Sequence, residues 1–473
     1  MPRRGTLPIV LTGVFVTILD FFIVNVAIPT TQRDLHAGTA AIEWVVAGYG
    51  LAYGSGLVLG GRLGDIHGRR RMFEIGLALF TLASIACGLA PDVGTLIGAR
   101  IAQGLSAALL GPQVLAILRT TYSGPAQARA VNAYALTMGL AAVFGQLIGG
   151  ALIQADLFGL GWRVCFLINA PIGVVVLALG RRMVPESRVE GATRLDLGGA
   201  AMVTTALVAL LLPLIEGREQ GWPLWTWLSF ALAAALLAGY SRRRHESPLI
   251  DVALFRERAF TVGLFTQLAY TMGMGAYFLI FAVYAQQGRG LDSLEAGLIF
   301  VPMGLGYLAA SGIAPALVAR WGRQVIAAGG LTRAVGLTLL LVAVTRDAAI
   351  GWLIPILVVD GVGMGLVLAP IMGTVLARVE PRHAGSAAGA LTTTQQVGGA
   401  LGIGIVGVVF YGDSGATVAQ AFEHGLIYLI VVALAVVVLV RFLPPTPARA
   451  GHAPAPAGPD SSTRSGTSPA GKR

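Results

Sequence analysis

Long apolar runs alternate with short polar connections along this chain up to about residue 443. A run of about 18 or more apolar residues is long enough to cross the hydrocarbon core of a bilayer as an α-helix. The pattern therefore predicts an all-α membrane protein. Fourteen runs are predicted to be membrane-spanning helices: 8–29, 41–61, 72–90, 94–117, 130–153, 163–180, 197–215, 224–240, 259–285, 294–318, 324–344, 350–377, 386–411 and 423–443.

Composition supports this prediction. The 473 residues are 55% hydrophobic and 12% charged, whereas soluble proteins carry roughly 25% charged residues. The net charge of +10 arises from arginines spread over short connections, so we expect no nucleic-acid partner. The six histidines lack metal-ligand spacing, and Cys87 and Cys165 lie in apolar runs. We therefore expect neither a metal site nor a disulfide.

The arginines also predict an orientation. If the N-terminus is cytoplasmic, most of them fall in the cytoplasmic set of connections. The opposite set holds Arg33, Arg163, Arg218, Arg289 and Arg346. Because basic residues favour the cytoplasmic side, both termini are predicted to be cytoplasmic. The first run contains Asp20 and has no small-residue cleavage site, so we expect no cleaved signal peptide.

An internal repeat divides the chain. Three sets of matching positions recur at a nearly constant separation: Gly68-Arg69 with Gly322-Arg323, Pro112 with Pro370, and Gly145 and Gly149 with Gly398 and Gly402. Chance matches in glycine-rich helices are the alternative, but weak internal symmetry is typical of transporters that rock two halves around a midplane site. We predict two six-helix bundles, 1–181 and 259–443, two inserted helices within 182–258, and a disordered cytoplasmic tail, 444–473.

Four charged residues lie more than five residues from either end of a predicted span: Asp20, Arg100, Arg333 and Asp360. An Asp at the centre of a membrane helix costs on the order of 2.5–3.5 kcal/mol. Asp20 and Arg100 are about 18 Å and 21 Å from the inner face, so the two are expected to meet. We predict a functional role for this pair, with a purely structural ion pair as the alternative. For Arg333 and Asp360, on adjacent spans, we favour a structural ion pair.

Residues 61–71 read GRLGDIHGRRR and follow the second span. Gly61 and Gly68 permit a tight turn. Asp65 and Arg69 are four residues apart and can pair, with Arg70 beside them. The segment is predicted to form a charged latch at the cytoplasmic rim. The alternative is a positive-inside loop with ordinary turn glycines. That alternative accounts for the arginines but not for Asp65 among them.

These motifs carry a family resemblance that extends from residue 8 to about 443. Residues 61–71 resemble the signature loop of the major facilitator superfamily. Residues 19–29, which read LDFFIVNVAIP, together with Trp44 and Tyr49, resemble the first two helices of its fourteen-span drug:proton antiporters. Residues 100–104, RIAQG, and 162–173 resemble further segments of that family. The resemblance implies the major facilitator fold, with two six-helix bundles plus two inserted helices, and export of drugs or antibiotics.

The fifth span resembles the antiporter motif of this family through Gly139, Gly145, Gly149 and Gly150. The resemblance implies a hinge, and ordinary packing by small residues is the alternative. Gln146 stands where the family usually has proline, which removes an expected kink. The second-half copy of the latch has Ala319 where Asp65 would align.

We expect Asp20 to be exposed alternately to the two sides of the membrane. Its carboxylate would then bind a proton on one side and release it on the other, with Arg100 as its partner. The proton is the coupling ion, and no other cofactor is expected. Polar or aromatic residues inside spans are candidates for the cavity: Asn25, Tyr49, Gln103, Gln146, Tyr270, Tyr277, Gln395 and Gln396. Few acidic residues lie in the spans, so small neutral apolar or amphipathic substrates fit at least as well as cations.

The sequence thus predicts a monomeric, multi-pass transporter of the cell membrane, whose partners are lipid and a small-molecule substrate and which is not an enzyme. An uptake symporter of the same fold is one alternative. A membrane sensor or enzyme is another, although no nucleophile–base pair or phosphate-binding loop is evident.

Overall fold

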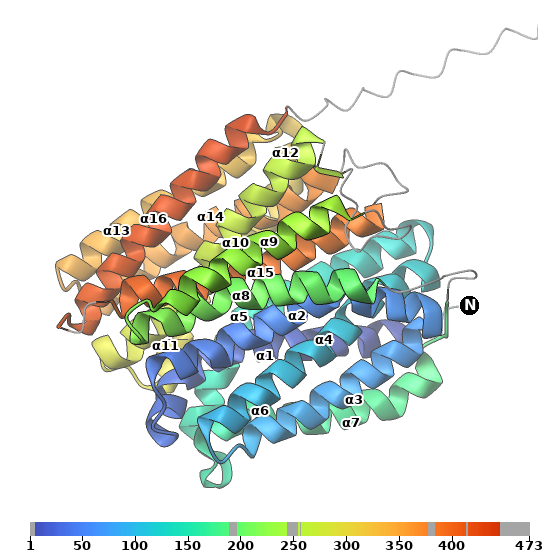
Figure 1. The fold of residues 1–473 in the computed structure, drawn as a ribbon, viewed down its shortest axis with the longest axis horizontal. Helices are drawn as coiled ribbons and strands as arrows, with labels where there is room; N and C mark the ends of the chain where they lie inside the picture. The colour runs from blue at the N-terminus through green and yellow to red at the C-terminus, as the bar shows by residue number, and fades with distance from the viewer. Residues whose placement is uncertain are drawn as a thin grey trace, which may run out of the picture.

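The fold is a bundle of long helices (Figure 1), and the computed structural model describes residues 5–188, 196–243, 254–255, 257–376, 384–412 and 415–444. The helices of the first part are α1 (Thr6–Asp34), α2 (Thr39–His67), α3 (Arg69–Gly88), α4 (Val93–Thr121), α5 (Gly124–Ala155), α6 (Val164–Leu167), α7 (Asn169–Met183), α8 (Leu197–Glu219) and α9 (Leu224–Arg242). They are followed by α10 (Arg258–Val283), α11 (Ser293–Leu298), α12 (Val301–Trp321), α13 (Gln324–Thr345), α14 (Ile350–Leu376), α15 (Ala384–Phe410) and α16 (Val418–Phe442). The described residues contain no strand, which confirms the all-α prediction.

Thirteen helical segments of the described chain are long and apolar enough to cross a membrane, and α2, bent by 47° after Leu57, makes up to fourteen. The number of predicted spans is therefore confirmed. Several predicted ends are wrong: α1 continues to Asp34 instead of residue 29, and α2 continues to His67 instead of residue 61. Apolar residues mark only the part of a helix that is buried in lipid, whereas backbone hydrogen bonding continues into the polar flanks.

Two predicted spans are interrupted in the structure. The span 163–180 divides into α6 and α7, and the span 294–318 divides into α11 and α12. Pro302 lies in the first turn of α12, where its missing N–H is tolerated. Hydropathy alone does not register such breaks because the residues at a break are as apolar as their neighbours.

The two halves repeat the same helix pairings. In the first half α1 packs on α5, and α4 packs on both α2 and α3; in the second α10 packs on α15, and α14 packs on both α12 and α13. Gly149 lies against Ile23 of α1, and Gly402 lies against the Met272 backbone of α10. The repeated glycines thus occupy equivalent contacts, and the two six-helix bundles of the predicted fold are confirmed. The residue boundaries of the domains stay a prediction, and residues 445–473 of the predicted tail lie outside the described residues.

The halves meet along two seams. On one seam α2 packs on α15, and on the other α5 packs on α11 and α12. The contacts are close: a side chain added at Gly54 on α2 would meet Gln396, and one added at Gly150 on α5 would meet the Ser293 backbone. Close approach of this kind is characteristic of small residues at membrane helix interfaces.

Helix α8 lies over the first seam, where it contacts both α2 and α15, with α9 packed on its outer side (green in Figure 1). Its C-terminal end binds the N-terminus of α2. Glu219 accepts a hydrogen bond from the Ala40 backbone N–H (3.1 Å), and Glu216 accepts one from the Trp44 indole (2.9 Å). A carboxylate at a helix N-terminus satisfies a free backbone donor and favours the helix dipole.

Candidate functional site

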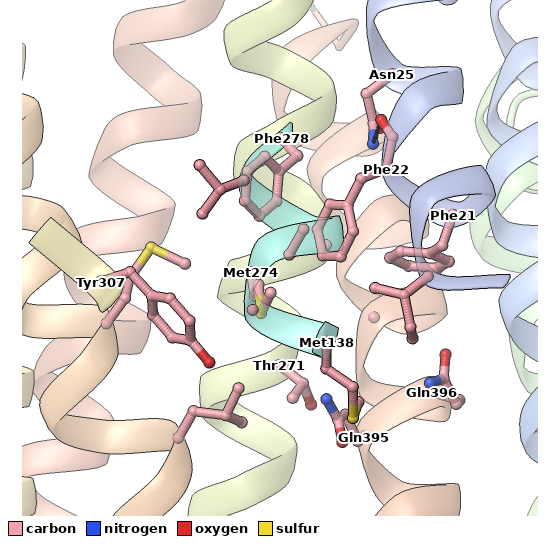
Figure 2. Close-up of a pocket in the computed structure, with 18 of the residues that line it drawn as sticks. Phe21, Phe22, Asn25, Met138, Thr271, Met274, Phe278, Tyr307, Gln395 and Gln396 are labelled. Atoms are coloured by element: carbon pink, nitrogen blue, oxygen red, sulfur yellow. Dashed lines mark hydrogen bonds between the residues drawn. The ribbon is translucent and has the colours of Figure 1, made fainter. Parts of the chain in front are cut away.

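A cavity of about 160 Å³ lies between the two halves (Figure 2). Helices from both halves line it, including α1, α2 and α5 of the first half and α10, α12, α14 and α15 of the second. Twelve of the 28 residues in its wall are aromatic or contain sulfur: Phe21, Phe22, Tyr49, Tyr53, Tyr134, Met138, Met274, Phe278, Phe300, Met303, Tyr307 and Met364. Flat rings and flexible thioethers suit bulky apolar ligands of varied shape.

The described residues that line this cavity include no formally charged side chain. The amide groups among its lining residues lie towards its two ends. Gln395, Gln396 and Thr271 group at one end, and Asn25 lies at the other, with Phe22 and Phe278 between them (Figure 2). A site of this kind is apolar with a small number of hydrogen-bonding groups that orient the ligand.

Four of the eight cavity candidates therefore line the cavity: Asn25, Tyr49, Gln395 and Gln396. The other four do not belong to its wall. Gln103 lies in a buried polar network, and Gln146 is fully buried on α5 beside Gly297 of α11. Tyr270 donates to the Met364 carbonyl (3.2 Å), and the ring of Tyr277 stacks on Phe281. The sequence identified polar residues inside spans but not the direction in which each one points.

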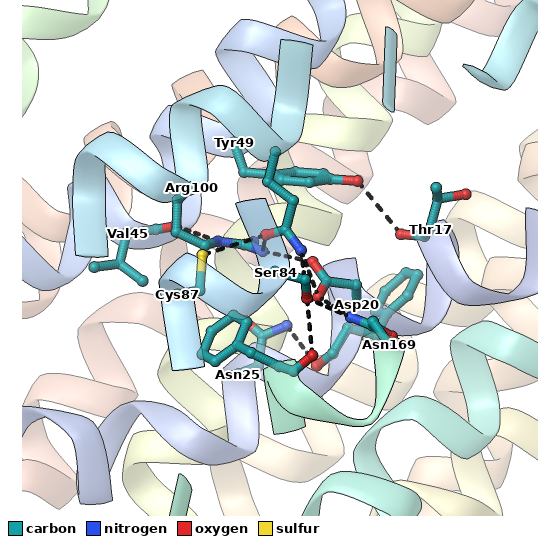
Figure 3. Close-up of polar contacts among 12 residues, drawn as sticks. Thr17, Asp20, Asn25, Val45, Tyr49, Ser84, Cys87, Arg100 and Asn169 are labelled. Carbon is teal, nitrogen blue, oxygen red and sulfur yellow. Dashed lines mark hydrogen bonds and ion pairs between the residues drawn. The ribbon is translucent and has the colours of Figure 1, made fainter. Parts of the chain in front are cut away.

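Asp20 and Arg100 lie in contact, both without exposure to solvent (Figure 3). The Arg100 Nη1 to Asp20 Oδ2 distance is 2.6 Å. The other Asp20 oxygen accepts hydrogen bonds from Gln103 (2.9 Å) and Asn169 (2.8 Å). The carboxylate is thus bonded on both oxygens, which offsets much of the cost of burying a charge.

Two members of this network were not singled out as site residues from the sequence. Ser84 of α3 accepts hydrogen bonds from Gln103 (3.1 Å) and Asn169 (2.9 Å). Asn169 is the first residue of α7, where the break after Leu167 aims its amide at Asp20. An asparagine in an apolar run is a detectable signal, but its partner lies more than a hundred residues away in the chain.

Tyr49 connects the cavity with the buried network. Its ring belongs to the cavity wall, and the Arg100 guanidinium lies 4.3 Å from the centre of the same ring. The Tyr49 hydroxyl donates to the Thr17 carbonyl of α1 (3.4 Å), as Figure 3 shows. Asp20 and Arg100 themselves are absent from the cavity wall. The shared ring is therefore a direct physical link between a bound ligand and the ion pair.

The predicted latch is a compact ion-pair cluster at the turn between α2 and α3. Asp65 pairs with Arg69 (2.8 Å). Gly68 has a φ of +104°, which a residue with a side chain rarely adopts. Glu186, which sequence reasoning missed, accepts hydrogen bonds from the backbone N–H groups of Arg70 (3.0 Å) and Arg71 (3.2 Å). Its carboxylate caps α3 from the segment after α7.

The α5 glycines face two different neighbours. Gly145 and Gly149 lie against α1 within the first half. Gly139 lies against Leu308 of α12, and Gly150 lies against the backbone of Ser293 in α11, both across the second seam. The same helix thus holds close contacts inside its own half and with the other half. Gly61 is less crowded, with Pro112 at 3.6 Å from an added Cβ.

Comparison with known proteins gives one family. The Major Facilitator Superfamily model matches residues 10–403. The chain is 34% identical to the "Probable actinorhodin transporter" of Streptomyces coelicolor, over 89% of this chain and 75% of that protein. It is 36% identical to the puromycin resistance protein pur8 of Streptomyces alboniger, over 90% and 84%. It is 34% identical to the cephamycin export protein CmcT of Amycolatopsis lactamdurans, over 92% and 91%.

Solved structures share the architecture. The xylose transporter XylE of E. coli, in a partially occluded inward open conformation, superposes with a TM-score of 0.66 at 14% identity. The match covers 93% of this chain and 98% of that chain. An autoinhibited POT family peptide transporter superposes with a TM-score of 0.67 at 16% identity, over 92% and 96%. At these identities the likeness shows the fold alone.

Proposed function

Because this chain belongs to the Major Facilitator Superfamily, we propose that it exports small, uncharged or amphipathic aromatic compounds from the cell in exchange for protons. The observation that carries the proposal is the cavity between the halves, which combines an aromatic and methionine-rich wall with a few amide and hydroxyl groups. The named activities of the relatives, which include antibiotic export and resistance, support export rather than uptake.

The two seams supply the conformational change. Opening the α2–α15 and α5–α11/α12 contacts at one end of the molecule, and then at the other, exposes the cavity alternately to each side. The latch at Asp65, Arg69 and Glu186 lies at the end that carries the α2–α3 turn. We assign that end to the cytoplasm, because the arginine-rich connections lie there. The latch then stabilises the state in which the cytoplasmic end is closed.

Asp20 is the proposed proton carrier of this cycle. Its charged form is held by Arg100, Gln103 and Asn169. A proton on the carboxylate removes the negative charge and releases Arg100, which retains its contact with the Tyr49 ring. A ligand that packs on the other side of this ring shifts Tyr49, and therefore alters the energy of the ion pair. Substrate and proton are coupled through Tyr49, because the carboxylate itself does not line the cavity.

Inside-out membrane vesicles test this proposal. We expect a pH gradient, acid inside, to drive accumulation of compounds from a panel of uncharged aromatic molecules without basic groups, and collapse of the gradient to stop it. Asp20→Asn keeps the shape of the side chain and removes its charge, so it should abolish gradient-driven accumulation while the protein remains in the membrane at normal amounts.

Ser123→Cys, in the exposed α4–α5 connection, is a matched control that should accumulate the same compounds as the wild type. Gradient-driven accumulation that is unchanged in Asp20→Asn contradicts the role of Asp20. Movement of the compounds out of the vesicles along with protons would instead identify an uptake symporter.

A further inference from the structure

The second half contains its own buried ion pair, formed by Arg333 of α13 and Asp360 of α14. The side chains are 4% and 1% exposed, and Arg333 Nε lies 3.6 Å from Asp360 Oδ1. This separation is longer than the 2.6 Å between Arg100 and Asp20. The carboxylates of these two ion pairs are therefore held in different ways.

The two ion-pair sites differ more in the hydrogen bonds to their carboxylates than in the distance between their charged groups. Asp20 accepts hydrogen bonds from Arg100, Gln103 and Asn169. Neither oxygen of Asp360 makes a well-formed hydrogen bond to the residues that the structure describes, although the Arg333 guanidinium and the Tyr277 hydroxyl face it. A buried carboxylate that lacks well-formed hydrogen bonds is costly as an anion, whereas a protonated carboxyl group is neutral and carries a donor of its own. The Asp360 site thus favours a proton in a way that the Asp20 site does not.

Arg333 can lose its carboxylate partner without being left isolated. Its guanidinium lies 5.4 Å from the ring centre of Tyr270 and 5.8 Å from that of Tyr277. Both tyrosines belong to α10. Aromatic faces stabilise a cation, and they do so more strongly away from water. A proton on Asp360 therefore breaks the ion pair while the arginine stays between two rings.

The groups that face Asp360 come from three helices. Arg333 on α13 is the charged neighbour, and Tyr277 and Tyr270 on α10 are the titratable ones. On α12, the backbones of Met303 and Tyr307 pack on Gly361 and Gly365 of α14. The α13 backbone also lies close, since a side chain added at Gly336 would meet the Asp360 backbone at 3.0 Å. This tight backbone packing leaves little room for water.

We propose that Asp360 is a second proton-binding site, and that it binds its proton independently of Asp20. The site lies close enough to the cavity to influence the substrate. Met364, one helical turn further along α14, lines the cavity. The backbone carbonyl of Met364 accepts a hydrogen bond from the Tyr270 hydroxyl. Proton binding at Asp360 loosens the contact between α13 and α14 and so moves the cavity wall. This coupling rests on the proposed function, but the proton binding does not.

Infrared difference spectra of the purified protein in lipid, recorded between acid and alkaline pH without substrate, test the proposal. A buried protonated carboxyl group gives a carbonyl band that is resolved from those of carboxylates and amides. Because the proposed protonation of Asp20 gives a band of its own, we expect the wild type to show more than one such band. Asp360→Asn should lose one of them, and Asp20→Asn should retain that same band. Asp347→Asn, at a carboxylate that is 91% exposed, is the matched control and should leave the band unchanged.

Tyr277→Phe keeps the test decisive if Asp360→Asn does not fold. This variant removes only the hydroxyl that faces Asp360, so it should shift the frequency of the band without abolishing it. If Asp360→Asn loses none of the wild-type bands, or if Tyr277→Phe leaves all of them unshifted, the proposal is overturned. Because no substrate is involved, such a result leaves the proposed export intact, and a failure of export leaves this measurement intact.

Discussion

At the scale of single residues, the candidate site depends on one ring. Tyr49 lines the cavity, and the centre of its ring lies 4.3 Å from the Arg100 guanidinium. The fold buries the guanidinium completely, so the contact is made away from water, where a cation–π interaction is worth about 2 kcal/mol. A small displacement of this ring by a ligand therefore has an appreciable effect on the ion pair.

Tyr49→Leu should weaken the coupling between substrate and proton. We expect its KM for a transported compound to rise by up to roughly 30-fold, corresponding to about 2 kcal/mol, and proton movement driven by that compound to fall. Tyr49→Phe keeps the ring and loses only the weak bond to Thr17, so it should resemble the wild type. Paired measurements of substrate flux and proton flux in proteoliposomes decide between these outcomes. Equal coupling in Tyr49→Leu and the wild type would refute the role of the ring.

At the scale of helices, the site is held in place by backbone contacts at glycines. A side chain added at Gly104 of α4 would lie 2.4 Å from the Tyr49 carbonyl of α2. One added at Gly60 of α2 would lie 2.1 Å from the Ala108 carbonyl of α4. These contacts fix the separation of α2 and α4, and thus the position of Arg100 under Tyr49.

Gly104→Ala should therefore destabilise the protein, by about 1–3 kcal/mol, because a backbone atom cannot move aside as a side chain can. Gly98→Ala, six residues earlier on α4, adds the same methyl group where nothing lies within 4 Å. It should be neutral or stabilising by up to about 1 kcal/mol, because alanine favours helix more than glycine. Thermal unfolding in detergent compares the two. Similar melting temperatures for both variants would show that the α2–α4 contact is looser than the structure indicates.

At the scale of the whole molecule, two similar halves carry different chemistry. Gly68 and Gly322 occupy equivalent turns, and both have positive φ. The acid of the latch is present only in the first half, since Ala319 stands where Asp65 would align, and Arg323 instead donates to the Arg441 carbonyl. The buried ion pairs also differ: one joins α1 to α4, and the other joins α13 to α14. The repeat thus supplies a symmetric scaffold for an asymmetric mechanism.

The proposed orientation predicts which end is reached from outside the cell. Both natural cysteines are fully buried, so an added cysteine at the surface should be the reactive one. Phe158→Cys, at a position that is 96% exposed in the α5–α6 connection, should react with a membrane-impermeant maleimide in intact cells. Ser123→Cys, in the α4–α5 connection, should react only after the membrane is opened. The reverse pattern would place the termini outside.

Much of the fold and part of the site could be predicted from the sequence. Hydrophobic run length gave the number of spans because the bilayer imposes one length on every crossing. The depth of Asp20 and Arg100 predicted their meeting, because a helix rises uniformly along its axis. Ser84, Asn169 and Glu186 could not be placed in this way, since each meets a partner from a distant helix. Tyr270 and Tyr277 were expected at the cavity but face the Arg333 pair instead.

The sequence by itself determined what must be buried in lipid, which charges lie within that layer, and which family the chain resembles, because these depend on composition and spacing along one helix. Only the tertiary structure decided which face each polar residue presents. The rotation of each helix about its own axis separates an uncharged cavity from the buried Asp20 network and places Tyr49 between them. It also left Asp360 without the donors that Asp20 has. Helix rotation is fixed by contacts between distant segments, such as those at Gly104 and Gly336, and these contacts exist only in the folded bundle.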